Sequence, residues 1–133
     1  TALIWEGRDP TPLLRYTGDP WLHQTIVRDR DGRLHRYADL GDAIAARPDA
    51  ADEEWRIHLH VPLFLERAPG GLRTTAPFLA EAAASLPDAA LAEVETYTRS
   101  LLPPELRGPS LAEDLARELA RAVELLGGAG GGA

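Results

Sequence analysis

The stretch that decides the expected fold is Trp55–Leu65, which reads WRIHLHVPLFL. Aromatic and β-branched residues dominate it, and two glycines follow shortly after it, so it is predicted to be a strand. Side chains alternate between the two faces of a strand, so His58 and His60 share one face. The opposite face is apolar and consists of Ile57, Leu59 and Val61.

A second strand is predicted at Ala90–Thr98, whose sequence is ALAEVETYT. Glu93 and Glu95 share one of its faces, and Val94 lies on the other. A helix is predicted between the two strands, at Thr75–Leu86. The alternation of strand, helix and strand is typical of parallel β/α units.

The clearest helix is predicted at Ser110–Leu126. Ser110 and Glu113 have the spacing of a capping box, in which each residue satisfies a free amide at the start of the helix. Apolar side chains recur at helical spacing and are predicted to lie buried against the sheet. This apolar stripe consists of Leu111, Leu115, Leu119, Val123 and Leu126.

The first third of the chain carries the signals of a hairpin and a short helix. Trp21–Arg28 is predicted to be a strand, and Asp31-Gly32 is typical of a tight turn. Leu34–Leu40 either pairs back as the second hairpin strand or leads into the next helix. That short helix is predicted at Asp42–Arg47, and Pro48 ends it.

Two interpretations fit strands with one apolar and one ionisable face. In a TIM barrel, helices cover the outer face, and the inner face opens onto a site at the strand C-termini. In an antiparallel sheet, the polar face is simply solvated. The pattern alone leaves both open. The resemblance described below favours the first: an α/β fold, with residues 1–126 forming the last β/α units of a TIM barrel after a hairpin-like insertion, and a flexible glycine-rich tail at 127–133. A complete barrel needs roughly 200 residues or more, and the chain has 133.

The composition excludes several classes of protein. The net charge of −7 argues against a nucleic-acid partner, since such surfaces are basic. There is no cysteine for a disulfide or a thiolate metal site, and no apolar run approaches the roughly 18 residues of a membrane span. We expect a soluble cytoplasmic protein without an organic cofactor.

Neutral imidazole and carboxylate together suit a divalent metal such as Mn²⁺, Co²⁺, Mg²⁺ or Zn²⁺. His60 and Glu95 come later in their strands than His58 and Glu93, so they lie nearer the expected catalytic rim. The other interpretation of this pattern is a solvated strand face without a metal. His23 could line a pocket, and the alternative is a surface or hairpin position. Arg99 could hold an anion, and the alternative is a solvated arginine.

Two short motifs resemble those of a known superfamily. His58–Val61 (HLHV) and Val94–Thr96 (VET) resemble the seventh and last strands of xylose-isomerase-like TIM barrels, which include sugar-phosphate isomerases and epimerases. Three longer segments are similar to the C-terminal half of EboE-type metabolite-traffic proteins, a branch of that superfamily. These are WLHQTIVRDRDGRLHRYADL, WRIHLHVPLFLE and AEVETYTRSLLPPELR, within a similarity that runs from roughly Thr1 to Val123.

The resemblance implies roles for individual residues. His60 would be a metal ligand, and Glu95 would be both a ligand and the catalytic general base. His58 and Glu93 would face the substrate or support the ligands. The function implied is isomerisation or epimerisation of a small metabolite; the alternatives are a non-catalytic metabolite carrier and a split barrel half that self-associates or needs a partner chain. The superfamily's other ligands come from earlier strands that this chain lacks, so metal affinity would be weak.

Overall fold

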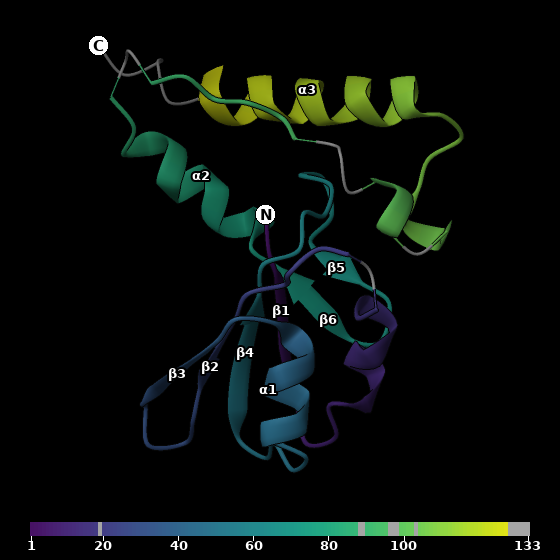
Figure 1. Ribbon diagram of the computed structural model, residues 1–133. Helices are drawn as coiled ribbons and strands as arrows, with labels where there is room; N and C mark the ends of the chain where they lie inside the picture. Colours follow the sequence, from purple (N-terminus) through teal and green to yellow (C-terminus); the bar gives the residue numbers. More distant parts are fainter. Residues whose placement is uncertain (19, 88–89, 96–98, 103, 128–133) are drawn as a thin grey trace.

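The computed structural model describes residues 1–18, 20–87, 90–95, 99–102 and 104–127 (Figure 1). Its main feature is a six-stranded sheet in the order β3-β2-β4-β1-β6-β5, in which every neighbouring pair is antiparallel. The strands are β1 (Leu3–Gly7), β2 (Thr25–Arg28), β3 (Leu34–Tyr37), β4 (Glu53–Ile57), β5 (Arg67–Ala68) and β6 (Leu72–Thr74). The helices are α1 (Leu40–Ala46), α2 (Ala76–Ala84) and α3 (Leu111–Gly127), with 3-10 turns η1 (Thr11–Tyr16), η2 (Arg99–Leu101) and η3 (Pro104–Leu106).

The parallel barrel portion predicted from the sequence is wrong. Strand β4 pairs on both sides with antiparallel neighbours, β1 and β2, and the chain leaves the sheet at His58. Residues 90–95 form no strand, and the rest of the strand predicted at Ala90–Thr98 lies outside the described residues. The reason is that alternating apolar and polar side chains equally suit an antiparallel sheet with one solvated face. The expectation that the chain pairs with a missing barrel half depended on the barrel fold, so it is no longer supported.

The hairpin predicted around Asp31-Gly32 is confirmed. Strands β2 and β3 pair directly, and Gly32 has a φ of 80°, a conformation that glycine adopts without strain. The Asp29 carboxylate stabilises the turn by accepting hydrogen bonds from the amides of Asp31 and Arg33. The predicted strand at Trp21–Arg28 forms only in its second half.

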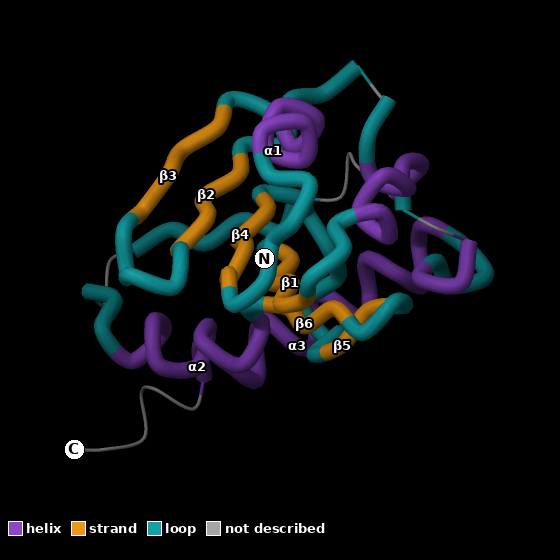
Figure 2. The backbone as a smooth tube through the Cα atoms, turned by 90° about the horizontal axis from the view of Figure 1, so that it is seen from below, coloured by secondary structure: helices purple, strands orange, loops and turns teal. Residues whose placement is uncertain are grey.

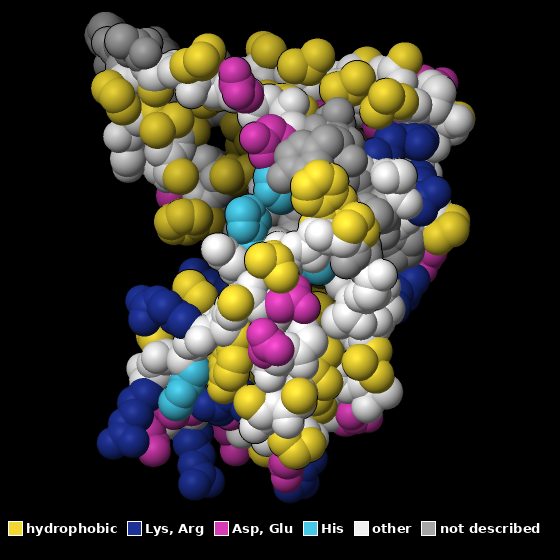
Figure 3. Space-filling view, in the orientation of Figure 1, with side chains coloured by type: hydrophobic (Ala, Val, Ile, Leu, Met, Phe, Trp, Pro, Cys, Tyr) yellow, Lys and Arg dark blue, Asp and Glu magenta, His cyan; other side chains and the backbone are white. Residues whose placement is uncertain are grey.

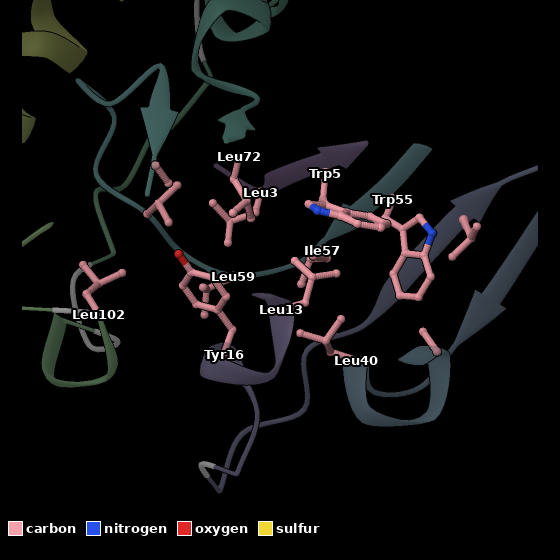
Figure 4. Packing of buried hydrophobic residues seen from close by; sticks show 14 of the residues in the cluster. Leu3, Trp5, Leu13, Tyr16, Leu40, Trp55, Ile57, Leu59, Leu72 and Leu102 are labelled. Carbon is pink, nitrogen blue, oxygen red and sulfur yellow. The ribbon is translucent and has the colours of Figure 1, made fainter. Parts of the chain in front are cut away.

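The core lies against one face of the sheet (Figure 4). Trp5 of β1 and Trp55 of β4 are cross-strand partners, and their rings meet edge to face with centroids 5.4 Å apart. Burying a large apolar side chain stabilises the fold by about 1.5–3 kcal/mol, so this pair is a major part of the core. Other fully buried core residues are Leu3, Leu13, Val27, Leu40 and Ile57.

The short helix α1 covers this core on one side of the sheet, as Figure 2 shows. Asp39 caps it, because its carboxylate accepts a hydrogen bond from the amide of Gly41. Leu40 and Ala43 are fully buried beneath it. The predicted short helix is therefore confirmed, with its start two residues earlier than Asp42.

Helices α2 and α3 lie together beyond the end of the strands (Figure 1). Helix α2 begins after Thr75, and the Thr74 hydroxyl accepts a hydrogen bond from the amide of Ala76. At the start of α3, the Ser110 hydroxyl accepts from the amide of Glu113, as the predicted capping box requires. None of the helices in the described ranges is long and apolar enough to cross a membrane.

The predicted burial of the apolar stripe of α3 is wrong. Leu119 and Val123 are 52% and 69% exposed, and Leu115 is only half-buried. The side of α3 that faces the protein instead carries Asp114 and Glu118, each only 6% exposed. In Figure 3, hydrophobic side chains accordingly follow the outer surface of this helix. Specific hydrogen bonds to the two carboxylates, described below, set the helix orientation.

Candidate functional site

The two histidines of the HLHV motif lie side by side just after β4. Their rings are stacked, with centroids 4.9 Å apart, and the Nε2 atoms of His58 and His60 are 3.0 Å apart. Leu59 and Val61 are buried, and these two anchors turn both histidines toward the same side. The predicted alternation therefore holds here, although the segment lies outside the sheet.

Glu95 meets this pair from a distant part of the sequence. Its Oε2 lies 3.1 Å from Nδ1 of His60, the nitrogen on the opposite side of the ring from His58. The Glu95 side chain is about half exposed, so water or a ligand can reach it. The structure thus brings together His60 and Glu95, the two residues that the sequence selected as metal ligands.

A small cavity of about 120 Å³ adjoins the cluster. Glu93, the other predicted acidic residue, lines it together with His60, Glu95 and Glu118. In the space-filling view, histidine side chains lie at the edge of a hollow between the helices above and the sheet below (Figure 3). The cluster is therefore open to ligands on one side.

The surroundings of His60 favour its neutral form. Burial lowers the pKa of His60, the His58 ring lowers it further, and the Glu95 carboxylate opposes this shift. A neutral imidazole has a free lone pair, which both a metal ligand and a general base require. His60 therefore keeps this lone pair at lower pH than an ordinary histidine.

His23 is buried beneath the histidine pair and contacts the backbone of His58. Its Nδ1 lies 3.3 Å from the carbonyl oxygen of His58, and its amide donates to Asp39. The sequence left open whether His23 lines a pocket or lies at the surface. The structure gives it a third position, in the interior behind the site.

Arg99 serves the structure, because its guanidinium is already engaged. Its Nε donates to the Asp114 carboxylate at 2.5 Å, and another nitrogen donates to the carbonyl of Gly108. Asp114 also accepts a hydrogen bond from the amide of Gly108. The arginine thus fixes the start of α3, and its candidate role as an anion ligand stays a prediction.

Glu118 is a site residue that sequence reasoning missed. It is not among the predicted site residues, yet it is buried, lines the cavity, and accepts a hydrogen bond from the amide of Leu63. Burial raises the pKa of Glu118, and the bond from Leu63 opposes that shift. The only signal was its spacing of four residues from Asp114, which puts both acids on one side of the helix.

A second pair of histidine and carboxylate provides an internal reference. In the β2–β3 hairpin, Nε2 of His35 lies 2.7 Å from Oδ2 of Asp29. This pair contacts no second histidine among the described residues. It shows that such contacts form for purely local reasons, so the distinctive feature of the candidate site is the close pair of Nε2 atoms.

The donor set of the candidate site is small. Among the residues that the structure describes, no group of three or more His, Cys, Asp or Glu side chains is arranged to hold a metal ion.

Comparison of the chain with models of protein families, with curated proteins and with solved structures found no match. The resemblance to EboE-type proteins therefore stays a prediction, and any function rests on the geometry of the cluster.

Proposed function

We propose that His58 and His60 bind a divalent transition-metal ion through their Nε2 atoms, at a site that acts on a small metabolite. The separation of 3.0 Å between these atoms carries the proposal. Two nitrogens bound to one tetrahedral ion at about 2.0–2.1 Å lie roughly 3.3 Å apart, so only a small ring movement is needed. Imidazole nitrogen suits Zn²⁺ and neighbouring ions of the first transition row.

Glu95 supports this assignment from the other side of the ring. A histidine that binds a metal usually donates its second ring N–H to a carboxylate, which fixes its tautomer and orientation. The contact from Nδ1 of His60 to Glu95 has this arrangement. Glu95 then positions His60 through Oε2 and is not the direct ligand that the resemblance implied, and its half-exposed carboxylate has a second oxygen that could act on a substrate.

The proposed reaction is proton transfer on a small metabolite, as in an isomerase or epimerase. A bound divalent ion would polarise a carbonyl oxygen. The half-exposed Glu95 carboxylate is the group that would accept a proton from the neighbouring carbon. Two protein nitrogens leave further positions for water or substrate, and they predict weak metal affinity. A non-catalytic metabolite binder is the alternative use of the same cluster.

Titration with Co²⁺ and Zn²⁺ tests the metal site directly. His58→Ala and His60→Ala should each abolish binding, and Glu95→Gln should weaken it about 10- to 100-fold, the usual effect of losing a carboxylate that orients a ligand. His35→Ala is the matched control and should change nothing, because His35 pairs with Asp29 in the distant hairpin. Equal binding by wild type and His60→Ala would overturn the proposal.

Proton exchange separates catalysis from binding. The metal-loaded chain should incorporate deuterium from solvent into sugars or sugar phosphates at the carbon next to the carbonyl, and Glu95→Gln should lose this activity. Metal binding without proton exchange on any such compound would favour the non-catalytic metabolite binder.

A further inference from the structure

Arginine and isoleucine side chains form a row across one face of the sheet. Residues directly opposite each other on neighbouring antiparallel strands project from the same face. The strand register therefore places six residues in one line, on the face opposite the tryptophan core. From β3 to β5 this row is Arg36, Ile26, Arg56, Ile4, Arg73 and Arg67.

The arginines of this row differ in how far their charge is compensated. Arg56 lies 3.1 Å from Glu54, which also pairs with a second arginine, and Arg73 lies 2.8 Å from Glu6. Arg36 is exposed and has no ion pair within the described part of the chain. Arg67, at the β5 end of the row, is also exposed and has no ion pair among the described residues, so uncompensated positive charge lies at both ends of the row, in a chain whose net charge is −7.

A hollow of about 530 Å³ lies over the β3–β2–β4 end of the row. Arg36, Arg56, Gln24, Tyr37 and His58 are among the residues that line it. Its size is within the range of about 300–1,000 Å³ that is usual for small-molecule sites. Arg36 and Arg56 flank Ile26 on neighbouring strands, with their backbones about 10 Å apart, so their long side chains can meet over the isoleucine.

We infer that this hollow binds the oxyanion group of a small metabolite, a phosphate or a carboxylate, clamped between Arg36 and Arg56. The planar guanidinium group can bind either oxyanion with two parallel hydrogen bonds. Arg56 contacts Glu54 through Nε, so its bonds to the anion would come from its two terminal nitrogens. His58 also lines the hollow and belongs to the histidine pair, so a ligand held by its anion extends toward the proposed metal. The identification of this ligand as substrate rests on the proposed function, whereas anion binding itself does not.

Titration of the metal-free chain with inorganic phosphate and, separately, with acetate tests the inference and identifies which oxyanion is preferred. Amide NMR shifts give the dissociation constants. Arg36→Gln and Arg56→Gln should each weaken binding about tenfold or more, since a hydrogen bond to a charged group contributes about 1.5–3 kcal/mol. Arg36→Lys should recover only part of the loss, because lysine keeps the charge and lacks the fork.

Arg67→Gln is the matched control, because Arg67 lies in the same row but outside the hollow. The dissociation constant of this variant should stay within about twofold of that of the wild type. This is well below the roughly tenfold weakening expected when an arginine of the clamp is lost. Equal weakening by all three glutamine variants would indicate a diffuse charge effect and overturn the clamp, as would the absence of saturable binding of either anion. His60→Ala should retain phosphate binding while losing the metal, so the two proposals fail separately.

Discussion

The sheet and the helical cap bury opposite kinds of side chain. In the sheet, the inward face is apolar and centres on Trp5 and Trp55. In the cap, formed by α2 and α3, the inward side of α3 carries Asp114 and Glu118, while its leucines face outward. Amphipathic spacing therefore identifies the two sides of an element without telling which side is buried.

The difference lies in what holds each region in place. Apolar burial is nondirectional, and it supports the sheet through many contacts. In the cap, Asp114 accepts hydrogen bonds from Arg99 and Gly108, and Glu118 accepts one from the amide of Leu63. The cap therefore depends on a few directional hydrogen bonds, and we expect it to open at lower free-energy cost than the sheet.

The largest effect is expected from Trp55→Ala in the sheet. Trp55 is fully buried, so its truncation should lower the free energy of unfolding by about 3–5 kcal/mol. Urea denaturation followed by circular dichroism measures this loss. A loss below about 1 kcal/mol would mean that the tryptophan pair is not the centre of the core.

A smaller but more local effect is expected from Asp114→Ala in the cap. The change leaves Arg99 and the amide of Gly108 without their partner, which should cost about 2–3 kcal/mol, less than a fully buried pair because Arg99 is partly exposed. Hydrogen exchange should quicken in α3 and stay unchanged in β4. Glu124→Ala is the control, since its pair with Arg121 is exposed and contributes under about 1 kcal/mol.

Leu119→Ala tests whether the apolar stripe of α3 is exposed to solvent. Leu119 is 52% exposed, so its loss should change the free energy of unfolding by no more than about 0.5 kcal/mol. A cost of about 2–5 kcal/mol, as for a buried leucine, would show that the stripe of α3 is covered in solution. Urea denaturation at two protein concentrations would then distinguish a neighbouring chain from an internal contact.

The smallest effect is the pH dependence due to Glu118. Burial raises its pKa in the folded state, so the folded chain holds this proton more tightly than the unfolded chain does. Its contribution to stability is therefore present below the ordinary carboxyl pKa and is lost as pH rises through the raised value. Glu118→Gln keeps an oxygen to accept from Leu63 and should reduce the loss of stability as the pH rises above the ordinary carboxyl pKa, whereas Glu124→Gln should not.

Local signals in the sequence predicted much of the secondary structure. The Asp31-Gly32 turn, the short helix before Pro48 and the capping box at Ser110 each depend on neighbouring residues. The structure contains the turn and the helix, and of the box it contains the bond from the Glu113 amide to Ser110, while the Glu113 carboxylate accepts from the Ser110 hydroxyl. The direction of strand pairing depends on distant residues. Alternation in Trp55–Leu65 fits a barrel and an antiparallel sheet equally, so pattern alone could not choose between them.

The candidate site was predicted in part. Alternation correctly put His58 and His60 on one side, and His60 does meet Glu95. The contact forms between two irregular segments and not between two strands, so His60 and Glu95 meet for a different structural reason than the predicted barrel. Glu118 and the arginine row were missed, because helix orientation and cross-strand register are set by tertiary structure.

The position of β1 has a consequence for the folding rate. This first strand lies near the middle of the sheet, where Leu3 pairs with both Ile57 and Thr74. Its partners are synthesised long after it, whereas β2 and β3 can form a hairpin at once. Loops of that length must close before β1 gains any hydrogen bond, and such non-local pairing slows folding. We therefore expect refolding in milliseconds to seconds, with the hairpin formed before the central strand is inserted.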